Sequence, residues 1–422
     1  MVRRYFGTDG VRGVVGDDLT VELVERLGRA ATLWTGGGAV LIGRDTRASG
    51  RELERAFASG VASAGGHAFL AGVLPTPAVA LLALDLGAVI SASHNPPKYN
   101  GVKLFDGDGG KLSDASEEEI EALLDEPPSN AESGGIDNLE VVASSYMRHV
   151  IEKFGGDLSG LRIAVDCANG AYSAIAPAAF AELGAEVIAI GASPDGHNIN
   201  VGCGATDLAA LQQTVMSEGA MLGIAFDGDG DRMLAVDELG QPVDGDQILA
   251  VLALHLGVDL VVVTSMTNLG FHRLMREHGI RTVTTDVGDR YVLEALRRKK
   301  GVLGGEQSGH IIYLDGHVTG DGLVAALLLF RSLDGRSLSE AAAVLDRYPQ
   351  AMESVPVSRK ELTEAVAAEV ERLNGELGEA GRVVVRPSGT EPVVRVLAEA
   401  ETREKADGLC GKVAALVREE LG

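Results

Sequence analysis

The chain is organised around residues 90–101, I-S-A-S-H-N-P-P-K-Y-N-G. Apolar residues 87–90 enter this stretch like a buried strand, and a small polar cluster with two prolines leaves it. We therefore expect a loop at a strand end. Ser93 stands at its centre and His94 follows. A serine there is either a nucleophile or, more commonly, a loop residue that bonds its own backbone. Two other stretches, D-G-D-G-D-R (227–232) and R-P-S-G-T-E-P (386–392), favour a nucleophilic Ser93.

The order strand, helix, strand, helix, strand precedes Ser93 and recurs twice along the chain. Asp227 follows the third strand of the second copy, and Glu306 follows that of the third copy. Alternating short strands and helices are typical of parallel-sheet α/β units, whose ligand sites lie beyond the carboxyl ends of strands. We expect three successive α/β domains of similar topology, with mixed or parallel sheets, around one central cleft.

The last part of the chain has a different pattern. A charged helix over 361–377, the motif R-P-S-G-T-E-P at 386–392, a strand and a final helix predict a smaller α+β domain. A polar segment from Asp125, rich in Pro, Gly and Ser, separates the first two units, and a flexible boundary is expected near 353–359. The predicted domains are 1–145, 146–250, 251–352 and 353–422.

Composition excludes several classes of protein. No apolar run approaches the roughly 20 residues that span a bilayer. The net charge of −24 argues against nucleic-acid and anionic-membrane partners. Three scattered cysteines and an N-terminus without an apolar signal region predict a cytoplasmic protein with free thiols. An anionic substrate would need local cations, and the candidates are Arg12, Lys103, Arg232, Arg386 and Arg395.

Asp227, Asp229 and Asp231 alternate with glycines in D-G-D-G-D-R. Three carboxylates this close repel one another unless a cation lies among them. Ligation by oxygen alone suits Mg²⁺, with a phosphate as a further ligand. An EF-hand is a weaker interpretation, because Arg232 stands where that loop needs glycine. A second alternative is a loop like that of the haloacid-dehalogenase-like phosphatases. It is disfavoured, because those proteins have threonine where this chain has Asp231.

Two further loops offer partners for a phosphosugar. Hydroxyls, guanidiniums and backbone exposed by glycine are the donors that a phosphate dianion needs. The C-terminal loop offers Arg386, Ser388, Gly389, Thr390 and Arg395. An ordinary turn with an Arg–Glu pair is the alternative there. The loop G-E-Q-S-G-H offers sugar hydroxyls the side chains of Glu306, Ser308 and His310.

These loops, in this order, resemble those of the α-D-phosphohexomutase superfamily over essentially the whole chain. The shared motifs are Y-F-G-T-D-G-V-R-G (5–13), S-A-S-H-N-P (91–96), N-I-N-V-G-C-G-A-T-D (198–207), G-I-A-F-D-G-D-G-D-R (223–232), V-G-D-R-Y-V (287–292), G-G-E-Q-S-G-H (304–310) and R-P-S-G-T-E-P (386–392). Within the superfamily, Gln307 and V-G-D-R-Y-V resemble the bacterial phosphoglucosamine mutases. By contrast, P-P-K-Y-N-G after His94 looks more like the mannose and glucose branch, which stays as an alternative.

The resemblance implies an isomerase that moves a phosphoryl group between Ser93 and a phosphosugar through a 1,6-bisphosphate. One Mg²⁺ would be held by phosphorylated Ser93 and the three aspartates. Lys103 would act as general acid and base, with Arg12 or His94 adjusting its pKa, and the sequence does not decide among them. Arg232 would neutralise charge near the metal.

In the same comparison, Glu306 and Ser308 would bind sugar hydroxyls with His310 nearby, and the C-terminal loop would hold the phosphate that is not reacting. The implied partner is a small phosphosugar, with no nucleic acid and no membrane. Whether the chain forms a homodimer stays open. An alternative from another class is a non-catalytic protein that binds sugar phosphates or divalent ions.

Overall fold

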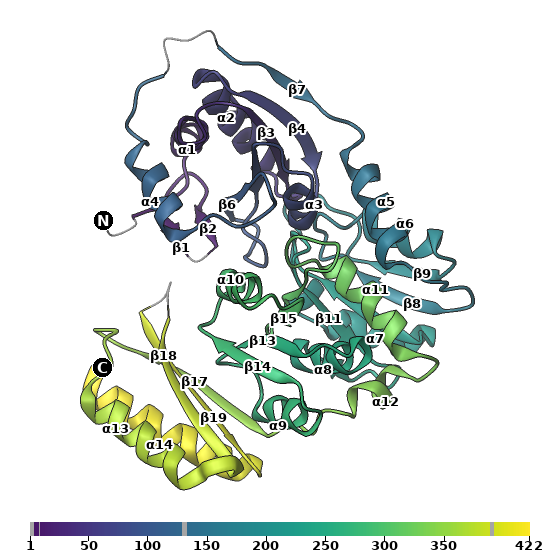
Figure 1. The fold of residues 1–422 in the computed structure, drawn as a ribbon, viewed down its shortest axis with the longest axis vertical. Coiled ribbons are helices and arrows are strands. Elements are labelled where there is room, and N and C mark those ends of the chain that lie inside the picture. Colours follow the sequence, from purple (N-terminus) through teal and green to yellow (C-terminus); the bar gives the residue numbers. More distant parts are fainter. Residues whose placement is uncertain (1–3, 8, 129–132, 389–391) are drawn as a thin grey trace.

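Four units, each with its own sheet, follow one another along the chain (Figure 1). The structure is a computed structural model that describes residues 4–7, 9–128, 133–388 and 392–422. Three of the units are the expected α/β domains, and the fourth is the smaller α+β domain. In the described part of the chain, every helix is too short or too polar to cross a membrane.

The first unit has a seven-stranded sheet in the order β1-β2-β6-β5-β3-β4-β7. Its strands are β1 (Phe6–Gly7), β2 (Gly10–Val14), β3 (Ala39–Arg44), β4 (His67–Val73), β5 (Leu86–Ile90), β6 (Tyr99–Asp106) and β7 (Ile136–Asn138). Its helices are α1 (Val21–Trp34), α2 (Gly50–Ser63), α3 (Thr76–Leu81) and α4 (Asp114–Ala122). Thr20 caps α1 as its sequence position predicts, accepting from the Leu23 N–H at 3.1 Å.

The second and third units repeat the central part of this sheet. The second sheet runs β12-β11-β10-β8-β9 and the third runs β14-β13-β15-β16. The strands are β8 (Arg162–Asp166), β9 (Glu186–Ile190), β10 (Leu222–Phe226), β11 (Met233–Val236), β12 (Pro242–Val243), β13 (Leu260–Thr264), β14 (Arg281–Thr285), β15 (Leu303–Gly305) and β16 (Ile311–Tyr313). The helices are α5 (Val142–Phe154), α6 (Ile175–Glu182), α7 (Ala209–Glu218), α8 (Gly245–Leu256), α9 (Leu269–Glu277), α10 (Asp289–Lys299), α11 (Gly322–Leu333) and α12 (Leu338–Ala342).

The three α/β units share one strand order. The repeat begins at β3, β8 and β13. Each of these strands pairs in parallel with the second and third strands of its repeat, and the third pairs antiparallel with the strand that follows. The third strands are β5, β10 and β15, which lead to Ser93, Asp227 and Glu306. This confirms the predicted similarity of the three domains.

The C-terminal unit is an antiparallel sheet in the order β17-β19-β18, with α13 and α14 packed on one face (Figure 1). Its elements are β17 (Gln350–Pro356), β18 (Gly381–Pro387), β19 (Val393–Ala400), α13 (Glu364–Leu377) and α14 (Arg403–Leu421). The expectation of a flexible boundary near 353–359 is wrong as far as Pro356, because these residues form β17 and bond to β19 along its length.

The hydrophobic cores do not follow the division into four units. One apolar core extends through the first three units, from Leu41 to Leu345. The C-terminal unit has a core of its own, built from residues 351–421. Shared burial therefore fixes the first three units to one another, whereas the fourth is joined to them mainly by the polar contacts described below.

Candidate active site

A buried arginine shapes the loop that carries Ser93. Arg47, from the loop after β3, is 1% exposed, and its guanidinium donates to four backbone carbonyls at 2.6–2.9 Å. These carbonyls belong to Ser93, Asn95, Pro96 and Tyr99. Asp45 pairs with Arg47 Nε at 2.9 Å, so the buried charge is neutralised. Arg47 thus replaces the backbone pairing that an irregular buried loop lacks.

Ser93 is held in a backbone conformation that side chains rarely adopt. Its φ is +51°, and its N–H donates to Ser91 Oγ at 2.9 Å. Its hydroxyl donates to Asp227 Oδ2 at 2.6 Å and lies 3.2 Å from His94 Nδ1. Left-handed backbone at a non-glycine residue persists only where surrounding contacts enforce it, and such residues cluster at functional sites.

Glycine at position 228 allows the aspartate loop to approach Ser93. A Cβ added there would lie 2.7 Å from the Ser93 carbonyl oxygen, too close for any side chain. Asn200 closes the same contact from the second unit, with Nδ2 2.9 Å from that carbonyl. The first two strand-end loops therefore meet, as the shared topology predicts.

Asp227, Asp229 and Asp231 converge and are almost fully buried. Each offers one oxygen, and these oxygens lie within 4.8 Å of one another. Asp229 Oδ2 accepts from Thr76 Oγ1 at 2.6 Å. One oxygen of Asp229 and one of Asp231 have no hydrogen-bond partner among the described residues. Unpaired buried oxygens are costly, so this cluster needs a further cation.

The charge state of the cluster leads to the same conclusion. Burial and then the carboxylates of Asp231 and Asp229 hold the pKa of Asp227 well above its usual value. Burial opposes ionisation of Asp231 as well, but Lys103, His310 and Arg232 together outweigh it and lower the pKa of that carboxyl. Asp227 therefore does not ionise beside its neighbours unless a further cation lies among them. The oxygen donors and their spacing fit Mg²⁺.

Lys103, on β6, lies against the same carboxylates. Its Nζ is 2.8 Å from both Asp229 Oδ2 and Asp231 Oδ2, and 3.0 Å from Asp9 Oδ2. Burial disfavours the ammonium, but these three carboxylates hold the pKa of Lys103 well above its usual value. Arg12, a neighbour in the adjacent strand β2, also pairs with Asp9.

The two residues predicted to adjust Lys103 have different surroundings. Arg12 Nη1 lies 3.5 Å from Asn95 Oδ1 and so joins β2 to the Ser93 loop. His94 is half-buried, and burial together with Arg232 and Arg12 lowers its pKa to about 4. His94 is therefore neutral near neutral pH. Arg232 follows the aspartates, with Nε 3.9 Å from Asp231 Oδ1.

The third strand-end loop approaches the same point. His310 Nδ1 lies 3.7 Å from Asp231 Oδ1, and its Nε2 lies 3.2 Å from Asp289 Oδ2. Asp289 also pairs with Lys111 of the first unit. Glu306 is buried, accepts from the Gly288 N–H at 2.8 Å, and lies 3.3 Å from Ser308 Oγ. Glu306 and Ser308 are thus adjacent, whereas His310 faces carboxylates.

Arg386 and Arg395 occupy directly opposite positions on β18 and β19. Like charges across a strand pair are unfavourable without an anion between them. Burial and then Arg395 lower the pKa of Arg386. The carboxylate of Glu306 raises it, so Arg386 lies close enough to the sugar loop for the two charges to interact. Ser388 is buried and its N–H donates to the Val393 carbonyl at 2.9 Å. Gly389 and Thr390 lie outside the described residues.

Several residues of this site were not predicted from the sequence. Arg47 and Asp45 sit two positions apart in the polar loop after β3, and that R-D-T-R pattern was the available signal. Asp9, Lys111 and Asp289 link the first and third units through ion pairs. Asp9 and Asp289 lie in the quoted motifs, but neither was given a role.

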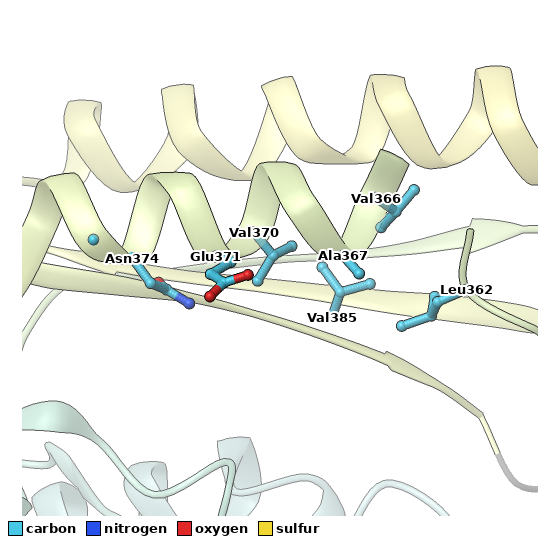
Figure 2. Close-up of a pocket in the computed structure, with 8 residues that line it drawn as sticks. Leu362, Val366, Ala367, Val370, Glu371, Asn374 and Val385 are labelled. Atoms are coloured by element: carbon cyan, nitrogen blue, oxygen red, sulfur yellow. The ribbon is translucent and has the colours of Figure 1, made fainter. Parts of the chain in front are cut away.

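The structure also has an apolar groove of about 630 Å³ between α13 and β18 (Figure 2). Its walls are Leu362, Val366, Ala367, Val370, Glu371, Asn374, Gly375 and Val385. None of the predicted site residues lines it, so this groove does not belong to the polar site.

Known proteins resemble this chain along its length. Four family models match in order, described as phosphoglucomutase/phosphomannomutase α/β/α domain I (residues 3–131), domain II (144–240), domain III (244–348) and C-terminal domain (352–416). A phosphoglucosamine mutase of Bacillus pumilus is 45% identical, with 99% of each chain covered. One from Saccharopolyspora erythraea is 48% identical, with 98% of this chain and 99% of that protein covered. A phosphoglucomutase/phosphomannomutase family protein of Burkholderia thailandensis has the same fold, with a TM-score of 0.83, 23% identity, and 98% and 97% of the two chains covered.

Proposed function

This chain belongs to the phosphoglucomutase/phosphomannomutase family, and we propose that it interconverts glucosamine 6-phosphate and glucosamine 1-phosphate. The observation that carries this proposal is the 2.6 Å contact between Ser93 Oγ and Asp227 in the carboxylate cluster. A hydroxyl at a metal-binding cluster is placed to carry a phosphoryl group. The choice of sugar rests on relatives that are 45–48% identical and are named phosphoglucosamine mutase.

In this proposal, Ser93 gives its phosphoryl group to the free hydroxyl of a sugar phosphate. The resulting 1,6-bisphosphate turns around, and its other phosphate returns to Ser93, so no phosphate is gained or lost. Arg47 and Asn200 hold the Ser93 carbonyl during both transfers, which keeps the attacking and leaving positions fixed.

Asp227, Asp229 and Asp231 would hold one Mg²⁺ together with an oxygen of phosphorylated Ser93. The ion would neutralise negative charge as the phosphoryl group is transferred. Asp9 and Asp289 pair with Lys103 and Lys111, so both ammonium groups stay charged beside that position.

Lys103 is our candidate for the group that moves the sugar hydroxyl proton. Its strongly raised pKa keeps the amine protonated, so it can donate a proton but cannot accept one. A cation bound by Asp229 and Asp231 would compete for the oxygens that Lys103 now contacts, and would thereby lower the pKa of the ammonium. Arg12 would add to that effect, since it already opposes the positive charge of Lys103.

Glu306 and Ser308 would accept and donate to sugar hydroxyls, with His310 behind them against Asp231. Arg386, Ser388 and Arg395 would hold the distal phosphate, together with Gly389 and Thr390. The limits expected near 250 and 352 would fall inside α8 and β17, so we place the domain limits near residues 145, 244 and 349, and each of the four domains contributes one loop.

The proposal is tested by following turnover with ³¹P NMR in the presence of Mg²⁺ and a trace of hexose 1,6-bisphosphate. Glucosamine 6-phosphate is compared with glucose 6-phosphate and mannose 6-phosphate. We expect the highest kcat/KM for glucosamine 6-phosphate. Preference for mannose or glucose phosphate would assign the chain to the other branch, and absence of any mutase activity would leave a binding protein.

A further inference from the structure

The side chain of Gln307 lies in the sugar loop, but its hydrogen bonds run to the junction with the C-terminal unit. Its Nε2 donates to Gln350 Oε1 at 3.0 Å and to Asp244 Oδ2 at 3.3 Å. Gln350 is the first residue of β17, whereas Asp244 caps α8 in the third unit. We used Gln307 above as a marker for the sugar, yet its contacts concern the placement of a domain.

Gln350 connects this amide to the interior of the C-terminal sheet. Its Nε2 donates to Glu399 Oε1 at 2.6 Å, and Glu399 is fully buried. Glu399 also accepts from Arg382 and, at 3.2 Å, from the N–H of Leu269 at the start of α9. Arg382 reaches back to the carbonyl of Thr267 in the third unit. The carboxylate of Glu399 is therefore bonded from both sides of the junction.

The same two strands carry the proposed phosphate ligands. Arg382 and Arg386 lie four residues apart on β18, and Arg395 and Glu399 lie four residues apart on β19. Residues at even spacing share one face of a strand. A change in how Glu399 is held would thus be transmitted along the strands to the arginine pair.

The segment that leads from the third unit into β17 is held in place just before Gln350. Asn268 accepts from the Tyr348 N–H and donates to the Tyr348 carbonyl, both at 3.0 Å. The backbone is therefore fixed two residues before Gln350. Pro349 then accepts from the Ala400 N–H at 3.2 Å, and the side-chain bond between Gln307 and Gln350 follows as a further contact that joins the two units.

We propose that Gln307 is a positioning residue that ties the sugar loop to the C-terminal sheet through Gln350 and Glu399. Glu306 and Ser308 flank Gln307, so a sugar held by them fixes the loop backbone and with it the position of Nε2. Binding of the sugar then favours the placement of the sheet in which Arg386 and Arg395 face the distal phosphate. This inference rests on the proposed function, because it assigns Gln307 to preparing the phosphate ligands for that reaction.

The test is a double-mutant cycle with Gln307→Ala, Gln350→Ala and the double variant. From the net free energy of a neutral hydrogen bond, we expect each single change to raise KM about 2- to 10-fold, with a smaller change in kcat. The double variant should be no worse than the poorer single variant, because both changes break the same link. The ratio of kcat/KM between glucosamine 6-phosphate and glucose 6-phosphate should stay constant throughout.

Gln212→Ala is the matched control, since Gln212 Nε2 donates at 2.7 Å to the Gly240 carbonyl within the second unit. That variant should keep the KM of the unmodified protein. An additive double variant, or a sugar ratio altered by Gln307→Ala alone, would overturn the proposal.

Hydrogen exchange supplies a readout that needs no turnover. Amides at the start of β17 should exchange faster in both Gln307→Ala and Gln350→Ala, and not in Gln212→Ala. Unchanged exchange in both variants would refute the tie even in an active enzyme. If the protein has no mutase activity but exchange responds as expected, the proposed function fails while the tie between loop and sheet stands.

Discussion

Ser93 donates a hydrogen bond to Asp227 at 2.6 Å although the two residues lie 134 positions apart. The contact joins the third-strand loops of two units that share one topology. It places the only non-glycine residue with positive φ in its loop directly on the carboxylate cluster. The backbone strain and the cluster would serve one purpose if Ser93 carries the phosphoryl group.

Ser93→Ala is expected to leave the fold intact and to lower kcat at least about 1,000-fold, because no other hydroxyl occupies that position. Intact-mass spectrometry of the unmodified protein should show a fraction heavier by one phosphoryl group, assigned to Ser93 by peptide mapping. Ser63→Ala, which removes a hydroxyl from the end of α2, is the control for folding and should keep full activity. Near-normal turnover in Ser93→Ala would contradict the mechanism.

The carboxylate cluster predicts dependence on a divalent cation. Chelation should abolish turnover and added Mg²⁺ should restore it, since the buried carboxylates need a cation to ionise together. Asp229→Asn should weaken Mg²⁺ binding in calorimetry, whereas Asp315→Asn, an exposed carboxylate elsewhere, should not. Full activity of the metal-free protein would rule out the metal site.

Arg47 should matter for stability as well as for the loop. Arg47→Met removes the guanidinium that pairs with Asp45 and donates to four backbone carbonyls, and breaking a buried ion pair costs about 3–5 kcal/mol. Urea unfolding should show that loss. Arg51→Ala, a change at an exposed arginine on α2, should shift stability by less than about 0.5 kcal/mol. Equal stability of the two variants would mean that Arg47 does not organise the loop.

The repeated α/β order could be predicted because strands of three to seven residues alternate with helices and end in unusual polar loops. The meeting of Ser93 with Asp227 followed from that topology. By contrast, α11 was not predicted. It is buried on nearly all sides, so its sequence, G-L-V-A-A-L-L-L-F, carries no polar face to mark it as a helix.

Arg47 was missed, and the contacts of Gln307 across the junction were not predicted, for a related reason. The hydrogen bonds of Arg47 go to backbone carbonyls, and backbone positions in an irregular loop are not encoded by any local pattern. Gln307 contacts Gln350, 43 residues later, across a junction that exists only in the folded chain. Motifs identify reacting groups well, but they do not identify the residues that hold those groups in place.

The burial of Asp246, on α8 beside the junction, should make the stability of the folded protein depend on pH. Burial and then Asp244 raise its pKa to about 7, although the Asn268 N–H and Thr267 oppose the shift. The folded pKa exceeds the unfolded value of about 4, so the associated stability is present below about pH 4 and is lost as pH rises to about 7. The free energy of unfolding should fall by up to about 4 kcal/mol over that range relative to Asp246→Asn.

Urea unfolding of both proteins at several pH values measures this difference. Asp315→Asn, at an exposed carboxylate, should follow the unmodified protein at every pH. A constant difference between Asp246→Asn and the unmodified protein would show that Asp246 does not titrate in this range.

Arg386 and Arg395, which face each other on β18 and β19, are the proposed ligands of the distal phosphate. If this pair holds the distal phosphate, it serves both orientations of the sugar, because either the 1-phosphate or the 6-phosphate is distal when the other reacts. A charge-assisted hydrogen bond contributes about 1.5–3 kcal/mol, so Arg386→Ala should raise KM about 10- to 150-fold for both the 1-phosphate and the 6-phosphate.

Mg²⁺ affinity and the phosphorylated fraction of Ser93 should stay unchanged in Arg386→Ala, because the proposed ligands of the cation lie in the first and second units. Arg403→Ala, which removes an exposed arginine from α14 in the same domain, is the control for a general effect of charge and should leave both KM values unchanged. If Arg386→Ala impaired only one of the two substrates, the arginine pair would serve a single orientation, and a different set of residues would have to hold the bisphosphate after it turns.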